Sequence, residues 1–224
     1  MEALKLRLKL LSPSLIGSAE GFGAIIDSDI VFDEHGIPFI PSKRLRGLLR
    51  DSANEVLEMF YLSGINLIPF KRKEDSFDII DELFGEAGQS YSSPLFISNL
   101  YIIEYENLSS WISYLTKKFS NFVNPERVRN YFTEIRQQTS IDEEKGVAKK
   151  HSLRTIRVAK KGLEFEGYLH LYEKREDFRR LLYFACLNLR RFGTRRTRGF
   201  GEIECRLFNE QGEINYFREL EVLQ

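Results

Sequence analysis

Residues 163–172 read LEFEGYLHLY, in which apolar and polar side chains alternate. In a strand, successive side chains point to opposite faces of the sheet. This alternation therefore predicts a strand with one buried face. Residues 176–190 follow with apolar side chains three and four positions apart, which predicts a helix, and residues 202–208 alternate again. The C-terminal part of the chain therefore predicts strand, helix and strand in that order.

A similar unit comes first in the chain. Residues 4–11 alternate and predict a strand, and a long amphipathic helix is expected from Ser42, as its N-cap, to near Gly64. A short helix over 77–84 and a strand over 94–103 complete this unit.

Residues 104–162 separate the two units and are the least regular part of the sequence. Helical pieces are expected near 109–119 and 126–132, and an exposed loop or hairpin tip over 139–150. The order βαβ, insertion, βαβ predicts an α+β fold of the ferredoxin-like, RRM-like type, built on split βαβ units. We expect a single domain over 1–224, with its core at about 4–103 and 163–208 and the insertion at about 104–162.

Composition excludes several classes of protein. The 224 residues include 33 Lys and Arg and 33 Asp and Glu, and 42% are apolar. This excludes a disordered chain and a uniform polycation. No apolar run reaches the length of a membrane span and the N-terminus is not a signal peptide, so we expect a cytoplasmic protein with no membrane partner. Cys186 and Cys205 are expected to be reduced core thiols.

The charge is segregated along the chain. Residues 145–206 hold 17 basic and seven acidic side chains, residues 41–50 hold basic side chains and no acid, and residues 74–86 hold acids and no base. A solvated face is the simple interpretation of any one block, but three such blocks favour a polarised surface.

The sharpest motif is RRFGTRRTRGFG at residues 190–201. Arginine offers paired donors to phosphate, and glycine lets the backbone approach a ligand closely. The motif is not a phosphate-binding loop of the Walker type. It predicts an RNA-backbone site, with a solvated basic loop as the alternative. The candidate residues are Arg195, Arg196, Arg198, Gly199 and Gly201.

A second motif lies at residues 36–50, GIPFIPSKRLRGLLR. Basic side chains at a helix N-terminus oppose the helix dipole, which suggests a purpose other than helix stability. The alternative is a charged helix face. The candidate RNA-binding residues here are Ser42, Lys43, Arg44, Arg46 and Arg50.

Three carboxylates, Asp27, Asp29 and Asp33, follow the first glycine-rich loop. They could hold a hard divalent cation, but turn-capping aspartates are the more frequent explanation of this spacing. The histidines His35, His151 and His170 are scattered, and no Ser-His-Asp arrangement is visible.

The ordered set of motifs resembles the RAMP superfamily of CRISPR effector proteins, and most closely the backbone subunits of type III (Csm/Cmr-like) complexes. The motifs are Ser12-Pro13, Ile16-Gly17-Ser18-x-x-Gly21, Gly36-x-Pro38-x-Ile40-Pro41-Ser42, Leu45-x-Gly47-x-x-Arg50, Leu83-Phe84-Gly85 and the final arginine-rich Gly-x-Gly loop. The segment around Ile141-Asp142-Glu143-Glu144 is also similar to that family.

The resemblance implies a modified RNA-recognition fold that binds crRNA along a basic face, with Lys149 and Lys150 in the set of RNA contacts. It implies other effector subunits and further copies of the chain, in a filament, as partners. Residues 104–162 would be a thumb-like insertion. Asp27 falls where the family's slicing subunits carry the aspartate that cuts target RNA, so the resemblance implies a divalent metal at Asp27, Mg²⁺ first.

Two alternatives stay open at this point. The family often has Pro-Gly-Ser-Ser-Leu-Lys-Gly before its first helix, whereas residues 41–47 read PSKRLRG. The chain could therefore be a structural RNA-binding subunit without nuclease activity. The other alternative is a guide-processing endoribonuclease that would use His35 and His151.

Overall fold

The fold is seen in a computed structural model, which describes residues 2–16, 26–74, 76–86, 93–139, 152–193 and 199–217. Within these residues one antiparallel sheet forms the centre. Strand β1 (Glu2–Leu10) pairs with β6 (Glu164–Leu171) on one side and with β7 (Ile203–Asn209) on the other. The order across the sheet is β2-β6-β1-β7-β8, so strands far apart in the sequence are neighbours.

Three short strands complete this sheet. Strand β2 (Leu95–Ile97) pairs with the C-terminal end of β6, and β3 (Tyr101–Ile102) pairs further back along the same strand. Strand β8 (Gly212–Glu213) pairs with the end of β7. Since each pair is antiparallel, β1 and β2 run parallel to each other with β6 between them.

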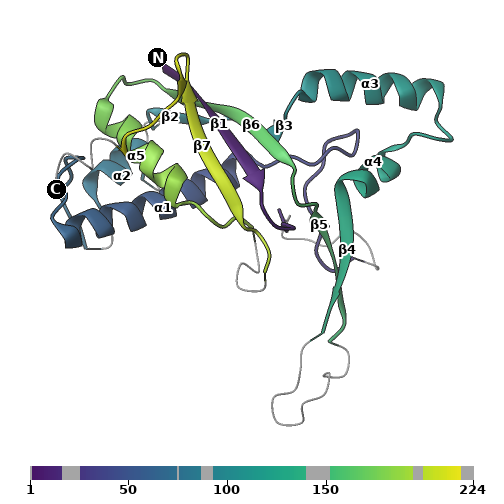
Figure 1. Cartoon of the computed structure of the whole chain (residues 1–224), viewed down its shortest axis with the longest axis horizontal. Coiled ribbons are helices and arrows are strands. Elements are labelled where there is room, and N and C mark those ends of the chain that lie inside the picture. Colours follow the sequence, from purple (N-terminus) through teal and green to yellow (C-terminus); the bar gives the residue numbers. More distant parts are fainter. Residues whose placement is uncertain are drawn as a thin grey trace, which may run out of the picture.

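Helices α1 (Ser42–Ser63), α2 (Asp78–Phe84) and α5 (Glu176–Asn188) lie together at one end of the molecule (Figure 1). Every second residue of β1 from Leu4 to Leu10 is fully buried in one core with the apolar stripes of α1 and α5. The alternation along β1 and β6 is therefore explained by one face buried under helices.

Within the described residues, the opposite face of the sheet carries ion pairs instead of a second layer. Lys9 Nζ lies 2.8 Å from the Glu164 carboxylate, and Arg7 Nε lies 3.3 Å from that of Glu166. Such cross-strand pairs of opposite charge stabilise a sheet modestly and leave this face nearly neutral.

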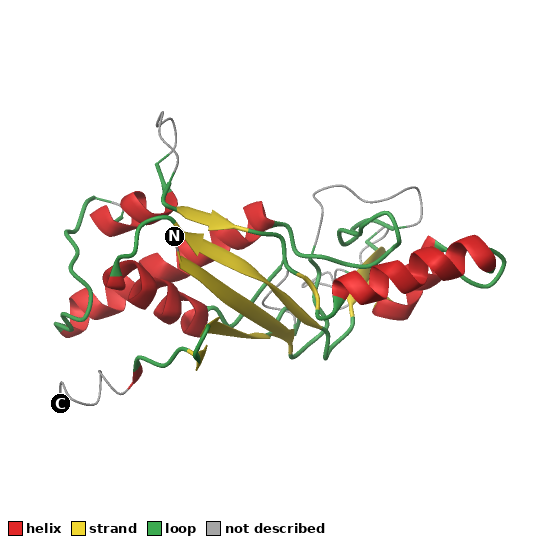
Figure 2. Ribbon diagram, turned by 90° about the horizontal axis from the view of Figure 1, so that it is seen from above, coloured by secondary structure: helices red, strands yellow, loops and turns green. Residues whose placement is uncertain are grey.

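The insertion lies at the other end of the molecule (Figures 1 and 2). It comprises α3 (Tyr105–Lys118), α4 (Pro125–Phe132) and the antiparallel hairpin of β4 (Thr133–Gln138) and β5 (Arg154–Ala159). A small second core of Ile112, Val128 and Phe132 packs around Ile37, which ties the insertion to the turn before α1.

The strands and helices expected from periodicity are confirmed, with three differences. Residues 94–103 form two strands, because residues 98–100 cross over Gly167, where a β-carbon would lie 2.6 Å from Asn99 O. Helix α1 is preceded by Pro41 as its N-cap, so Ser42 is its first residue. The helix expected near 109–119 begins earlier, at Tyr105.

The structure also shows the state of the cysteines and the character of the helices. Cys186 and Cys205 are free and buried, as expected of core thiols. Among the described residues, no helix has the length and the apolar character needed to cross a membrane.

Candidate functional site

Residues 26–30 run alongside strand β5, where they contact residues 155–157. The Asp27 N–H donates to Thr155 O at 2.8 Å, and the Arg157 N–H donates to Ser28 O at 3.0 Å. The bridge between Ser28 and Ile156 is parallel. This short added strand fixes where Asp27 lies relative to the hairpin.

Asp27 is the exposed member of the three aspartates. One of its carboxylate oxygens, Oδ2, accepts a hydrogen bond from the Thr155 N–H at 2.6 Å, and the residue faces solvent. The backbone thus holds the carboxylate at one oxygen while the residue stays accessible to a ligand.

Asp29 and Asp33 have structural partners instead. Asp29 is 4% exposed, and its carboxylate pairs with Arg157 Nη1 at 3.0 Å. The carboxylate of Asp33 accepts from the His35 and Ile37 N–H groups at 3.0 and 2.7 Å, and from the Tyr105 hydroxyl at 2.9 Å. Burial and the contact with Asp33 raise the pKa of Tyr105, so the phenol remains a donor.

The three aspartates therefore do not form a metal cage. Within the part of the chain that the structure describes, no three His, Cys, Asp or Glu side chains come together as metal ligands. Asp33 behaves as the turn-capping residue of the simpler interpretation, and Asp27 is left as a single carboxylate that a cation could share with another ligand.

The basic block at the start of α1 points partly inward. Arg46 Nη1 donates to Phe84 O at 2.9 Å, and Arg46 Nη2 donates to Leu95 O. Arg50 Nη1 donates to Gly85 O, and its Nη2 lies 2.7 Å from the Asp81 carboxylate. Burial and the neighbouring Arg50 lower the pKa of Arg46. These two arginines tie Phe84, Gly85 and Leu95 to the helix, so we assign them to the fold rather than to RNA contact.

The remaining candidates on α1 are more accessible. Lys43 is exposed, and Arg44 is half-buried. Ser42 is partly buried, and its N–H donates to Asn99 Oδ1 at 2.9 Å. Lys43 and Arg44 are therefore the members of this block whose side chains have access to a polyanion.

The arginine-rich loop is shaped at its base by two glycines. A β-carbon on Gly193 would lie 2.4 Å from Leu15 O, and one on Gly201 would lie 2.0 Å from Phe192 O. Both have positive φ, so the backbone needs glycine there. Gly199 is exposed with open space around it. Lys149, Lys150, Arg195, Arg196 and Arg198 lie outside the described residues.

The two histidines that the structure describes lie in different elements. His35 lies in the turn that Asp33 caps, and His170 lies on β6 against the rings of Phe96 and Tyr168. His151 lies outside the described residues.

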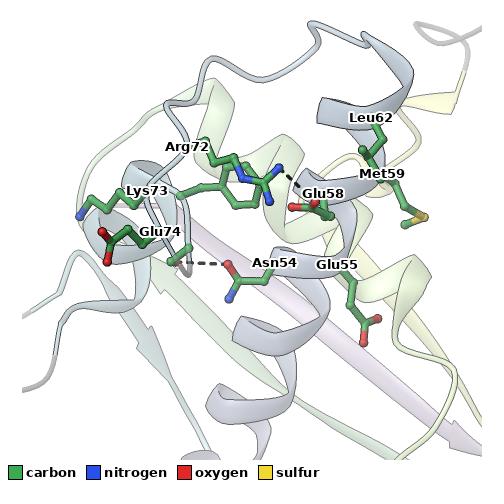
Figure 3. Close-up of a pocket in the computed structure, with 10 residues that line it drawn as sticks. Asn54, Glu55, Glu58, Met59, Leu62, Arg72, Lys73 and Glu74 are labelled. Atoms are coloured by element: carbon green, nitrogen blue, oxygen red, sulfur yellow. Dashed lines mark hydrogen bonds and ion pairs between the residues drawn. The ribbon is translucent and has the colours of Figure 1, made fainter.

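A surface pocket of about 510 Å³ lies between α1 and residues 72–74 and 76–77 (Figure 3). It is crossed by an ion pair of 3.1 Å between Arg72 and Glu58 and by a hydrogen bond of 3.3 Å between Ser76 and Asn54. These contacts hold the segment to the helix, at the end of the molecule away from the hairpin that holds Asp27 (Figure 1).

Sequence reasoning missed Thr155 and Arg157, which bind Asp27 and Asp29 and so hold residues 26–30 in place. Both lie 128 residues from their partners in that strip. Arg157 appeared only as one of the basic residues of 145–206, and no local pattern pairs it with Asp29. The alternation of β5 is the one signal that could have placed both near a sheet edge.

The chain belongs to the RAMP superfamily, whose family model matches residues 7–204. Two solved structures that share its fold are those of the type III-B Cmr-beta complex. The chain is 14% identical over 92% of its length to a chain of the complex bound to cognate target RNA, with 97% of that chain covered and a TM-score of 0.63. The chain is 15% identical over 93% of its length to a chain of the same complex in the apo state, with 98% of that chain covered and a TM-score of 0.62. No curated protein matches the sequence.

Proposed function

We propose that the chain is an RNA-binding subunit of a type III CRISPR effector complex that cleaves guide-paired target RNA through Asp27. Its ligands are crRNA and target RNA, and its partners are other effector subunits and further copies of itself in a filament in the cytoplasm. Family membership and the shared fold support the subunit role. The observation that carries the catalytic role is the exposed Asp27 carboxylate, held at one oxygen by the Thr155 N–H.

The proposed chemistry is an internal transfer in the RNA backbone. Asp27 takes the proton of a 2′-hydroxyl, the 2′-oxygen forms a bond to the adjacent phosphorus, and the bond from phosphorus to the 5′-oxygen breaks. The 5′-oxygen takes a proton from water, and the hydroxide that remains takes the proton from Asp27, which restores the water and the carboxylate. The products are a 2′,3′-cyclic phosphate and a 5′-hydroxyl, so atoms and charge balance. The Thr155 N–H orients the carboxylate for this step.

We propose that any divalent cation, Mg²⁺ first, is shared between Asp27 and RNA phosphate. This fits a chain in which the described residues supply no group of three metal ligands, since Mg²⁺ is commonly held by one or two carboxylates and substrate phosphates. When bound, such a cation neutralises negative charge on the reacting phosphate.

We infer that the sheet core is a ferredoxin-like, RRM-like domain with glycine-rich loops. The antiparallel order β2-β6-β1-β7, with α1 after β1 and α5 after β6, supports this inference. Lys43, Arg44, Lys149, Lys150 and the loop 193–201 are the proposed contacts to RNA backbone. The ion-paired open face of the sheet is not among the proposed RNA contacts, because its charges already neutralise one another.

The test is cleavage of target RNA by the reconstituted complex, with native chain against Asp27→Ala. Loss of the base should slow cleavage by about 10²- to 10⁴-fold at unchanged target affinity. Asp51→Ala is the matched control, because Asp51 is also an exposed aspartate but lies on α1. Equal cleavage by native and Asp27→Ala complexes would show a structural RNA-binding subunit. Cleavage that survives chelation by EDTA would exclude the shared cation.

A further inference from the structure

Residues 26–30 form the strip that carries Asp27. A buried ion pair at Asp29, two residues further along the chain, fixes this strip. Asp29 Oδ2 lies 3.0 Å from Arg157 Nη1, and the two side chains are 6% and 11% exposed. Asp29 Oδ1 accepts from the Ile30 N–H at 2.8 Å. A buried pair of this kind is costly to break, because the partner that remains is an unpaired charge away from water.

Arg157 is held on several sides. Its N–H binds Ser28 O, so its backbone and its side chain both grip the strip that carries Asp27. Its guanidinium lies 5.9 Å from the centre of the Phe32 ring, which Arg129 also approaches at 5.2 Å. Its buried Nε has no hydrogen-bond partner among the described residues, and Asp29 is the acid that pairs with the guanidinium there.

The register of the strip follows from these contacts. Thr155 and Arg157 are two residues apart on β5, and they bind Asp27 and Asp29, also two residues apart. A one-residue slip of the strip would move Asp27 away from the Thr155 N–H and would turn its side chain to the other face. The ion pair therefore locks the one register in which Asp27 is both held and exposed.

We propose that Asp29 and Arg157 are positioning residues for Asp27, which set the register of residues 26–30 on β5 and so the place of the Asp27 carboxylate. This rests on the proposed function of Asp27. Neither residue touches RNA in this role. Their contribution is to the rate of the chemical step and not to the affinity for target.

The test uses the reconstituted effector complex with target RNA at saturation in single turnover. Asp29→Asn and Arg157→Gln each leave one buried charge unpaired and should slow cleavage by up to about 100-fold, as small displacements of a reacting group do. The dissociation constant for target RNA should stay unchanged. The double variant Asp29→Asn with Arg157→Gln removes both charges and should recover part of the rate.

Two further measurements separate positioning from stability. Hydrogen exchange of the Thr155 amide should be faster in the single variants, because the Asp27 carboxylate no longer holds it. Arg206→Gln is the matched control, since it breaks an exposed arginine–carboxylate pair, 2.6 Å to Glu204, and should leave the rate unchanged.

The outcomes are distinct. A native rate at saturation in Asp29→Asn, or a fall in target affinity with the rate unchanged, would overturn the positioning role while Asp27→Ala still abolished cleavage. An active Asp27→Ala complex would instead remove the proposed function itself. If Asp29→Asn does not assemble, Arg157→Lys takes its place under the same criterion, because it keeps the charge and loses the planar fork.

Discussion

The start of α1 and the stretch 190–201 are both rich in arginine, and they use their residues differently. On α1, Arg46 and Arg50 reach back into the chain, where they donate to the carbonyl oxygens of Phe84, Leu95 and Gly85. In the stretch 190–201 the described constraints lie in the backbone, at Gly193 and Gly201, while Arg190 and Arg191 are exposed.

The difference lies in what each segment has to connect. Arg46 and Arg50 are four residues apart, on one side of helix α1, where the carbonyl oxygens of Phe84, Gly85 and Leu95 lie within their reach. The stretch 190–201 joins α5 to β7, and its backbone must pass close to Leu15 and Phe192. An arginine-rich sequence is therefore not by itself an RNA site, because a guanidinium group satisfies carbonyl oxygens as well as phosphates.

The largest expected effect concerns the backbone at the end of the stretch 190–201. Gly201→Ala should lower the free energy of unfolding by about 3 kcal/mol or more, since it adds left-handed strain to an overlap with Phe192 O. Gly199→Ala is the matched control: its φ is also 76° but the space around it is open, so about 1–2 kcal/mol is expected. Urea unfolding of both variants measures the difference, and equal losses would contradict the close packing.

The next effect separates the two roles of arginine and lysine on α1. Arg46→Ala should lower the free energy of unfolding by about 2–3 kcal/mol, because it removes a partly buried guanidinium that donates to the carbonyl oxygens of Phe84 and Leu95. Lys43→Ala, at an exposed position on the same helix, should leave stability unchanged and reduce the salt dependence of RNA binding by about one unit of slope. Chemical unfolding and RNA titration at several salt concentrations check both. If Arg46 only bound RNA, Arg46→Ala would leave stability unchanged and would reduce the salt dependence of RNA binding.

Periodicity predicted most of this fold, because the alternation of β1 and β6 and the apolar stripes of α1 and α5 report directly which faces are buried. The break at residues 98–100 could not be predicted, since it depends on a close crossing over Gly167 on a strand far away in the sequence.

The candidate site was predictable only in part. Asp27 was found through the resemblance, whereas the hydrogen bond that holds it comes from Thr155, 128 residues away. The roles of Arg46 and Arg50 were also hidden, because helical spacing places them on one face without saying what that face meets. Residue types and spacings are local, and these contacts are set by tertiary packing.

The smallest expected effect is on the labelling of two buried thiols, which reports how firmly α5 and β7 hold the stretch between them. Cys186 on α5 and Cys205 on β7 are 1% and 4% exposed. The hydrogen bond with Cys205 and burial raise the pKa of the Cys186 thiol, so at pH 8 little thiolate is available to react. Both thiols should resist iodoacetamide in the native chain and react after unfolding. Gly201→Ala should speed this labelling by loosening the stretch between α5 and β7, whereas Lys43→Ala on α1 should not. Equal acceleration in both variants would mean that the two regions open together and are not held separately.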